Sequence, residues 1–183
     1  YLSHKILPQV QARTGAEVQY IPCLLGGIFK ATNNQSPMMA YANIRHKMKY
    51  ELLEMQRFIA KHKINEFKKN PHFPLSSLMA MRGAVACQQI GCVEQYADLM
   101  FRAMWEQELK IDELPVIENV LRGSQLEADT ILSAIASADV KQQLIENTEQ
   151  AVERGVYGLH SFFVGEEMGF GTDRLRDVEA YLA

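Results

Sequence analysis

Residues 155–170 read GVYGLHSFFVGEEMGF, and this stretch decides the fold. It contains a compact β-type run, a Gly-Glu turn and a second short run, at residues 161–164, 165–166 and 168–170. Thr172 follows as a candidate N-cap of an amphipathic run, with Asp173 in the first turn, where the helix dipole favours an acidic residue. The chain is therefore predicted to close with a β-hairpin and a helix.

The opening of the chain predicts a helix followed by a strand. Apolar residues at helical spacing run through residues 2–10, and Gly15 is suited to the left-handed turn that ends a helix. Residues 16–20 alternate apolar and polar side chains before Pro22, which is typical of a short strand. The sequence opens on Tyr1 instead of Met, and we expect one further strand upstream of it.

The middle of the chain is predicted to be helical. Gly26-Gly27 and residues 32–37 have loop chemistry, and from residue 40 to 154 amphipathic patterns are broken at Asn70-Pro71, Gly91, Pro115 and Gly123. We therefore expect an α/β protein, with a thioredoxin-like domain interrupted by a large all-helical insert. Residues 1–36 and 155–183 would form the thioredoxin-like domain, and residues 37–154 the insert.

Composition and cysteine usage narrow the class of protein. The 183 residues are 48% hydrophobic and 22% charged, as in globular domains, without a run of 18 apolar residues or the order of a signal peptide. A cytoplasmic protein is expected. Cys23, Cys87 and Cys92 form no CxxC pair and are odd in number, which argues against a disulfide framework or a dithiol redox centre and favours buried free thiols.

Charge is unevenly distributed, although the net charge is only −3. Residues 45–69 are basic, whereas residues 106–153 are rich in Asp and Glu. A basic helix face is usually solvated, but it also permits a non-catalytic helical module that binds nucleic acid or another polyanion. Such a polyanion-binding module is the alternative to an enzyme.

Four segments resemble the family of kappa-class glutathione transferases and 2-hydroxychromene-2-carboxylate isomerases, within the DsbA-like thioredoxin superfamily. Its signature segments are similar to residues 155–164 (GVYGLHSFFV) and 170–175 (FGTDRL), its first loop to residues 26–34 (GGIFKATNN), and its insert to residues 72–82. The resemblance implies a thioredoxin-like fold with a helical insert, glutathione as cofactor, and a homodimer.

The resemblance also assigns five glutathione-binding residues. Asp173 matches the position that receives the γ-glutamyl ammonium, and Thr172, with free N–H groups of the last helix, matches the γ-glutamyl carboxylate site. Asn34 and Lys47 match positions that reach glutathione from the first loop and the insert, and the backbone of Leu159 matches the group that pairs with the cysteinyl unit. Together they would line one cleft between the domains. Without the resemblance, the residues alone favour a cap, a dipole partner, a turn Asn and a solvated Lys.

The sequence departs from the family pattern at two positions. The family serine that contacts the glutathione sulfur lies upstream of Tyr1, and Ser3, one residue past that segment, does not replace it, so no catalytic residue is assigned in this chain. His160 stands where the family has a cis-proline. Since a cis bond before a non-proline residue costs about 3–4 kcal/mol, against under about 1 kcal/mol before proline, a trans Leu159–His160 bond is predicted. Glutathione affinity would then be poor, and His160→Pro would restore it.

Three enzyme activities remain open. The resemblance favours a glutathione-dependent isomerase that acts on a small, hydrophobic, unsaturated aromatic carboxylate. A kappa-like glutathione transferase or a DsbA-like thiol oxidoreductase is the alternative on the same fold. The five histidines have no metal-ligand spacing, and no GxGxxG or P-loop occurs, so no metal or nucleotide cofactor is expected.

Overall fold

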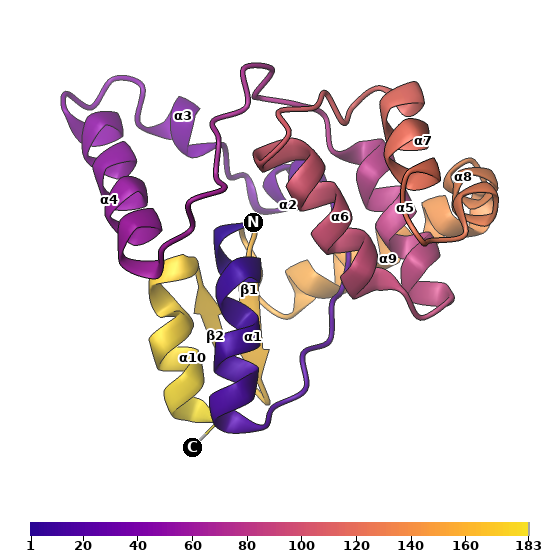
Figure 1. The fold of residues 1–183 in the computed structure, drawn as a ribbon. Coiled ribbons are helices and arrows are strands. Elements are labelled where there is room, and N and C mark those ends of the chain that lie inside the picture. Colours follow the sequence, from indigo (N-terminus) through magenta and orange to yellow (C-terminus); the bar gives the residue numbers. More distant parts are fainter. Residues whose placement is uncertain (183) are drawn as a thin grey trace. The chain divides into compact units, whose positions relative to one another are not determined.

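The structure, a computed structural model, describes residues 1–182. Its elements in chain order are α1 (Leu2–Thr14), α2 (Leu25–Thr32), α3 (Pro37–Ala40), α4 (Lys47–His62), α5 (Leu78–Gln89), α6 (Val93–Trp105), α7 (Leu114–Arg122), α8 (Ala128–Ile135), α9 (Ala138–Glu153), β1 (Ser161–Val164), β2 (Glu167–Phe170), the 3-10 turn η1 (Thr172–Arg174) and α10 (Leu175–Tyr181) (Figure 1). The predicted helical middle and closing hairpin and helix are confirmed.

The chain divides into two compact units. The first comprises residues 1–18 and 28–67 and the chain from Val156 onward, and the second comprises residues 19–27 and 68–155. Residues 28–67, most of which we assigned to the insert, thus group with both ends of the chain. The domain boundaries drawn from the sequence, after residues 36 and 154, stay a prediction.

Helix α1 ends as its sequence predicts. Gly15 adopts a left-handed conformation with φ of 70°, and its N–H donates to the carbonyl of Gln11 at 2.8 Å. Ile6, Leu7 and Val10 on one face of the helix are buried. The apolar spacing in the sequence therefore located both the helix and its buried side.

The predicted strand at residues 16–20 is wrong. These residues have no regular secondary structure, and the sheet within residues 1–182 contains only β1 and β2. A strand requires a hydrogen-bonded neighbour, and no backbone ladder is described for residues 16–20. The segment instead leads from the first compact unit into the second, which begins at Gln19.

The predicted loop at Gly26-Gly27 is also wrong, because both glycines lie inside α2. A Cβ on Gly27 would lie 3.0 Å from Cγ2 of Thr148, and the Thr148 hydroxyl accepts a hydrogen bond from the N–H of Leu24 at 3.0 Å. Gly27 thus allows close packing on Thr148, which is a tertiary role that turn propensity does not reveal. Three of the remaining breakers act as predicted, since Gly91 has φ of 78°, Pro115 lies in the first turn of α7 and Gly123 follows its last residue.

The hairpin and its covering helices form the part of the first unit that carries the candidate site. Strands β1 and β2 pair antiparallel, with Ser161 opposite Phe170 and Val164 opposite Glu167. Helix α10 packs on both strands and against α1 (Figure 1). Gly169 is required at this contact, because a Cβ there would lie 2.8 Å from Cγ2 of Val178 on α10.

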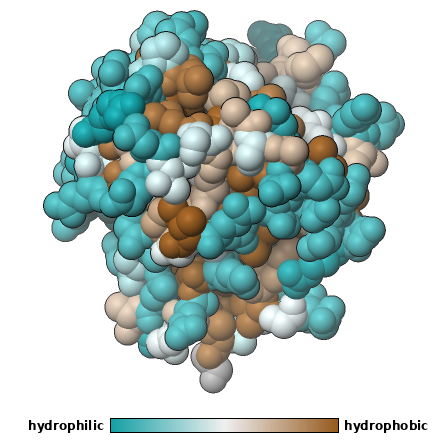
Figure 2. All heavy atoms as spheres, turned by 90° about the vertical axis from the view of Figure 1, so that its right-hand side faces the viewer, coloured by the Kyte–Doolittle hydropathy of each residue, from teal (hydrophilic) through white to brown (hydrophobic). Residues whose placement is uncertain are grey.

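The second unit has a core built by helices α5 to α8. Small residues of α5 face the large apolar side chains of α6, α7 and α8, and the fully buried ones include Tyr96, Ile117, Leu121, Ile131 and Ile135. The face in Figure 2 is mainly hydrophilic with apolar patches between the polar groups. No helix within residues 1–182 combines the length and apolar character that crossing a membrane requires.

Candidate functional site

Three polar side chains from separate elements meet beside the hairpin. Ser3 lies in the first turn of α1, His160 directly precedes β1, and Thr172 begins η1. Oγ of Ser3 is 2.6 Å from Nε2 of His160 and 3.2 Å from Oγ1 of Thr172, and Oγ1 of Thr172 is 3.1 Å from the same imidazole nitrogen. These three side chains, here called the hydroxyl–imidazole triangle, are the polar centre of the candidate site.

The prediction that Thr172 is a helix N-cap is wrong. Helix α10 begins three residues later, after the η1 turn, and no side-chain cap is described for either element. The Thr172 hydroxyl contacts Ser3 and His160 instead. Because the hydroxyl is not used in capping, the alternative that Thr172 serves only to start a helix loses its basis.

The prediction of a trans Leu159–His160 bond is also wrong, because this peptide bond is cis. The carbonyl of His160 accepts a hydrogen bond from the N–H of Gly171 at 3.1 Å, while its imidazole contacts two hydroxyls. Long-range contacts that the local sequence does not show therefore fix His160 at both its backbone and its side chain. The expectation that His160→Pro restores glutathione affinity has no further support.

The environment of His160 keeps its imidazole neutral. Burial is the main cause that lowers the pKa of His160 from its usual 6.5 to about 4, while the Asp173 carboxylate acts in the opposite direction. At neutral pH the ring therefore carries a single proton. It can act as a donor through one nitrogen and as an acceptor through the other.

Acid is expected to destabilise the protein through His160. Because the folded-state pKa lies below the unfolded value, the contribution of the neutral ring is complete above about pH 6.5 and is lost as the pH falls toward 4. Between pH 7 and 4 the wild type should lose on the order of 2 kcal/mol more unfolding free energy than His160→Gln, whose side chain does not titrate. Denaturant unfolding at both pH values measures this, and equal losses would contradict it.

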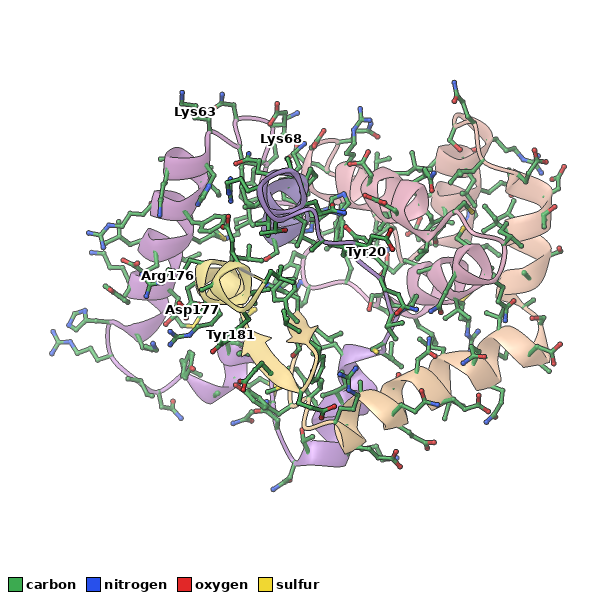
Figure 3. The ribbon with its side chains drawn as sticks, turned by 90° about the horizontal axis from the view of Figure 1, so that it is seen from below. Tyr20, Lys63, Lys68, Arg176, Asp177 and Tyr181 are labelled. Carbon is green, nitrogen blue, oxygen red and sulfur yellow. The ribbon has the colours of Figure 1, made fainter. Side chains whose placement is uncertain are left out.

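Asp173 lies at the edge of an open hollow on the same unit. Its side chain is 79% exposed, and its nearest described cation is Nε of Arg174 at 3.8 Å. The hollow lies beside α10, which Figure 3 shows end-on with Asp177 and Tyr181 labelled, and its lining includes Tyr157, Phe170, Gly171, Asp173, Asp177 and Tyr181. The Asp173 carboxylate is therefore accessible to a cationic group of a ligand.

Leu159 presents an accessible backbone next to the triangle. The residue is 38% exposed, and the β1 ladder begins only at Ser161. No backbone hydrogen bond is described for Leu159 within residues 1–182. Its peptide groups can therefore pair with an extended peptide, which is how sheet-edge sites bind such ligands.

Asn34 and Lys47 belong to the same compact unit but are held by other residues. The Asn34 amide donates to the carbonyl of Tyr157 at 2.7 Å, two residues before Leu159. The Lys47 ammonium forms an ion pair with Glu51 and lies 4.9 Å from the ring centroid of Tyr41. No contact described within residues 1–182 joins Lys47 to the other four predicted site residues.

The cysteines do not resemble a thiol redox centre. All three are free, Cys23 and Cys87 are buried, and Cys92 is partly buried. Burial raises the pKa of Cys23 to about 11 and also raises that of Cys87, so both remain protonated at neutral pH. Among the described residues no group of three His, Cys, Asp or Glu side chains is placed to hold a metal ion.

The basic residues 45–69 are partly neutralised by acidic neighbours on α4. Lys47 pairs with Glu51, and Arg57 pairs with Glu54. Such pairs leave less free positive charge for the counterion release that drives polyanion binding. The structure therefore gives no specific support to the polyanion-binding alternative.

The antiparallel hairpin, the helices packed on it and the long helical middle define a DsbA-like thioredoxin fold. The family model of the DSBA-like thioredoxin domain matches residues 1–183, and the chain belongs to this family. A solved structure of 2-hydroxychromene-2-carboxylate isomerase has the same fold, with a TM-score of 0.83 and 22% identity over 98% of this chain and 86% of the other.

Curated relatives span nearly the whole chain. A 2-hydroxychromene-2-carboxylate isomerase of Sphingobium xenophagum is 26% identical over 192 residues, which cover 100% of this chain and 91% of the relative. Glutathione S-transferase kappa 1 of Rattus norvegicus is 27% identical over 198 residues, which cover 100% and 84%. These relatives are isomerases or transferases, and they support an enzyme of this family.

Ser3 is the site residue that sequence reasoning missed. We set it aside because it does not occupy the family serine position. It lies, however, on the apolar stripe of α1 with Ile6, Leu7 and Val10, and it is only 5% exposed. A hydroxyl on a buried helix face requires a polar partner, and this was the signal that could have identified it.

Proposed function

We propose that this protein is a glutathione-dependent isomerase that acts on a small, unsaturated aromatic carboxylate. The observation that carries the proposal is the match of nearly the whole chain to proteins named 2-hydroxychromene-2-carboxylate isomerase, three of which cover 96–100% of it. The kappa-class relative supports glutathione as the cofactor. By family resemblance, the protein would work as a homodimer.

Three residues of the site fit the chemistry of glutathione. Asp173 offers an exposed carboxylate for the γ-glutamyl ammonium, and Thr172 offers a hydroxyl for the adjacent carboxylate. The accessible backbone of Leu159 suits the cysteinyl peptide unit. These three residues also lie within fifteen positions of one another, on either side of the same hairpin.

The other two proposed glutathione-binding residues, Lys47 and Asn34, are already held by protein groups. Lys47 must first change its partner, and Asn34 would act indirectly. Lys47 must leave its ion pair with Glu51 before its ammonium can reach a ligand carboxylate. Asn34 holds the Tyr157 carbonyl, and we propose that it orders the chain that leads to Leu159. An exposed ion pair contributes only about 0–1 kcal/mol, so little free energy is lost when Lys47 exchanges Glu51 for a carboxylate of the ligand.

Bound glutathione would supply a thiolate that adds to a conjugated double bond and leaves again after rotation, so that it is not consumed. The described residues would orient it by binding its γ-glutamyl end and its cysteinyl backbone. The ring centroids of Tyr157 and Phe170 lie 4.8 Å apart, and the two rings offer an apolar surface beside Asp173 for the aromatic ring of a substrate. Correct mutual orientation is what such a site contributes to rate.

The reaction is tested by incubating the protein with reduced glutathione and a hydroxychromene carboxylate, and separately with a chlorinated aromatic electrophile. We expect glutathione-dependent isomerisation of the first without net loss of thiol, and little conjugation of the second. Samples without glutathione, or with the inactive S-methylated form, are the controls. Stoichiometric thiol loss with the electrophile and no isomerisation would favour a transferase and overturn the proposal.

A further inference from the structure

The hydroxyl–imidazole triangle has few protons for its three contacts. Each hydroxyl carries one donor proton, and the neutral imidazole of His160 carries one N–H. We assign the Ser3 hydroxyl as the donor in its contact with Oγ1 of Thr172. With its only proton used, Ser3 must act as the acceptor in its 2.6 Å contact with His160, so that Nε2 of the ring is the donor.

This arrangement leaves the proton of Thr172 unused inside the triangle. A protonated Nε2 cannot accept it, and Ser3 already donates to Oγ1. No partner is described for Nδ1 of His160 within residues 1–182, and proteins tolerate an unpaired acceptor more readily than an unpaired N–H. The proton is therefore better placed on Nε2, and the Thr172 O–H bond turns out of the triangle.

We propose that Ser3 and His160 are positioning residues that aim the Thr172 hydroxyl proton outward, toward the α-carboxylate of a γ-glutamyl ligand. This rests on the glutathione site proposed above. Ser3 is too buried to serve as a ligand itself, so it acts through Thr172. A hydroxyl that is already oriented toward the ligand carboxylate loses less entropy on binding than a hydroxyl that rotates freely.

Two peptides test this assignment by calorimetric titration: reduced glutathione, and γ-aminobutyryl-cysteinylglycine, which lacks only the γ-glutamyl α-carboxylate. Ser3→Ala lets the Thr172 proton turn inward, so we expect it to weaken glutathione binding about 5- to 10-fold and analogue binding less than about twofold. Thr172→Val should have the same selectivity. A general structural defect would weaken both peptides equally.

The imidazole donor is tested by a conservative and a non-conservative variant. His160→Gln keeps an N–H near the position of Nε2 and should retain most of the glutathione affinity, whereas His160→Leu should lose it to the same extent as Ser3→Ala. Nitrogen chemical shifts of the wild-type imidazole at neutral pH should show the Nε2–H tautomer. This measurement needs no variant to fold.

The outcomes separate the two proposals. If the wild type binds glutathione and Ser3→Ala binds it equally well, or if the ring is the Nδ1–H tautomer, the positioning role is overturned and the glutathione site stands. If the wild type binds neither peptide, both proposals are overturned. If it binds both peptides equally, the contact of Thr172 with the carboxylate is overturned, and with it the positioning role.

Discussion

Gly83→Ala is expected to destabilise the protein by about 3 kcal/mol or more, as overpacking does in a core that cannot relax. Gly83 is buried in α5, and a Cβ there would lie 2.1 Å from the hydroxyl oxygen of Tyr96 and 2.6 Å from its Cζ. Tyr96 cannot move aside easily, because its side chain is 1% exposed and its hydroxyl donates to the carbonyl of Ala80 at 3.0 Å. The added methyl group must displace either the ring or the helix.

The control for this variant is Gly26→Ala, in helix α2. A Cβ on Gly26 meets no atom within 4 Å, so only the helix propensity changes. This substitution should stabilise the protein by about 0.5–1 kcal/mol. Denaturant unfolding of both variants is the measurement, and a Gly83→Ala protein as stable as Gly26→Ala would show that Tyr96 does not pack on α5 as described.

Asp173→Asn is expected to weaken glutathione binding roughly 10- to 100-fold, because a charge-assisted hydrogen bond to the γ-glutamyl ammonium becomes a neutral one. The carboxylate is exposed, and its nearest described cation, Nε of Arg174, lies 3.8 Å away, so the ammonium of a ligand can compete with this loose contact. The substitution preserves the shape of the side chain. Folding should be little changed, because surface substitutions usually alter stability by less than about 0.5 kcal/mol.

Asp177→Asn provides a matched control for Asp173→Asn. Asp177 also lines the hollow beside α10, but Arg174 and Arg176 lie 3.3 Å from its carboxylate oxygens. Titration of both variants with reduced glutathione should show a large loss for Asp173→Asn and less than about a threefold change for Asp177→Asn. Equal losses would mean that the hollow attracts glutathione only through its general charge.

The sequence predicted the elements whose signals are local. The hairpin at residues 161–170 follows from two short β-type runs around a Gly-Glu turn, and the end of α1 follows from Gly15, because a glycine there removes the steric cost of the left-handed conformation. The helical middle follows from apolar spacing in the same way. These parts of the fold therefore needed no knowledge of distant contacts.

The errors all occur where a distant contact decides the structure. Residues 16–20 have strand-like alternation but no described ladder partner, and Gly27 packs on Thr148, which is 121 positions away in the sequence. Thr172 resembles a cap, yet its hydroxyl faces Ser3 across the unit. The propensity of a short sequence segment carries no information about such distant partners.

The candidate site could be predicted only in part. Asp173 and Thr172 were identified by resemblance to the family, and the structure makes both available to a ligand without testing that role. The contacts of Ser3 with His160 and Thr172 join α1 to η1 and to the residues before β1. Those contacts form only when both ends of the chain come together.

Calorimetric titration of the wild-type protein with reduced glutathione decides whether the proposed glutathione site exists. We expect saturable binding to one site per chain, with an affinity that falls when cysteinylglycine, which lacks the γ-glutamyl group, replaces glutathione. The difference between the two peptides should largely disappear in Asp173→Asn, because this residue is assigned to the missing ammonium. No saturable binding at glutathione concentrations up to about 10 mM, which corresponds to less than about 3 kcal/mol of binding free energy, would contradict the proposed glutathione site.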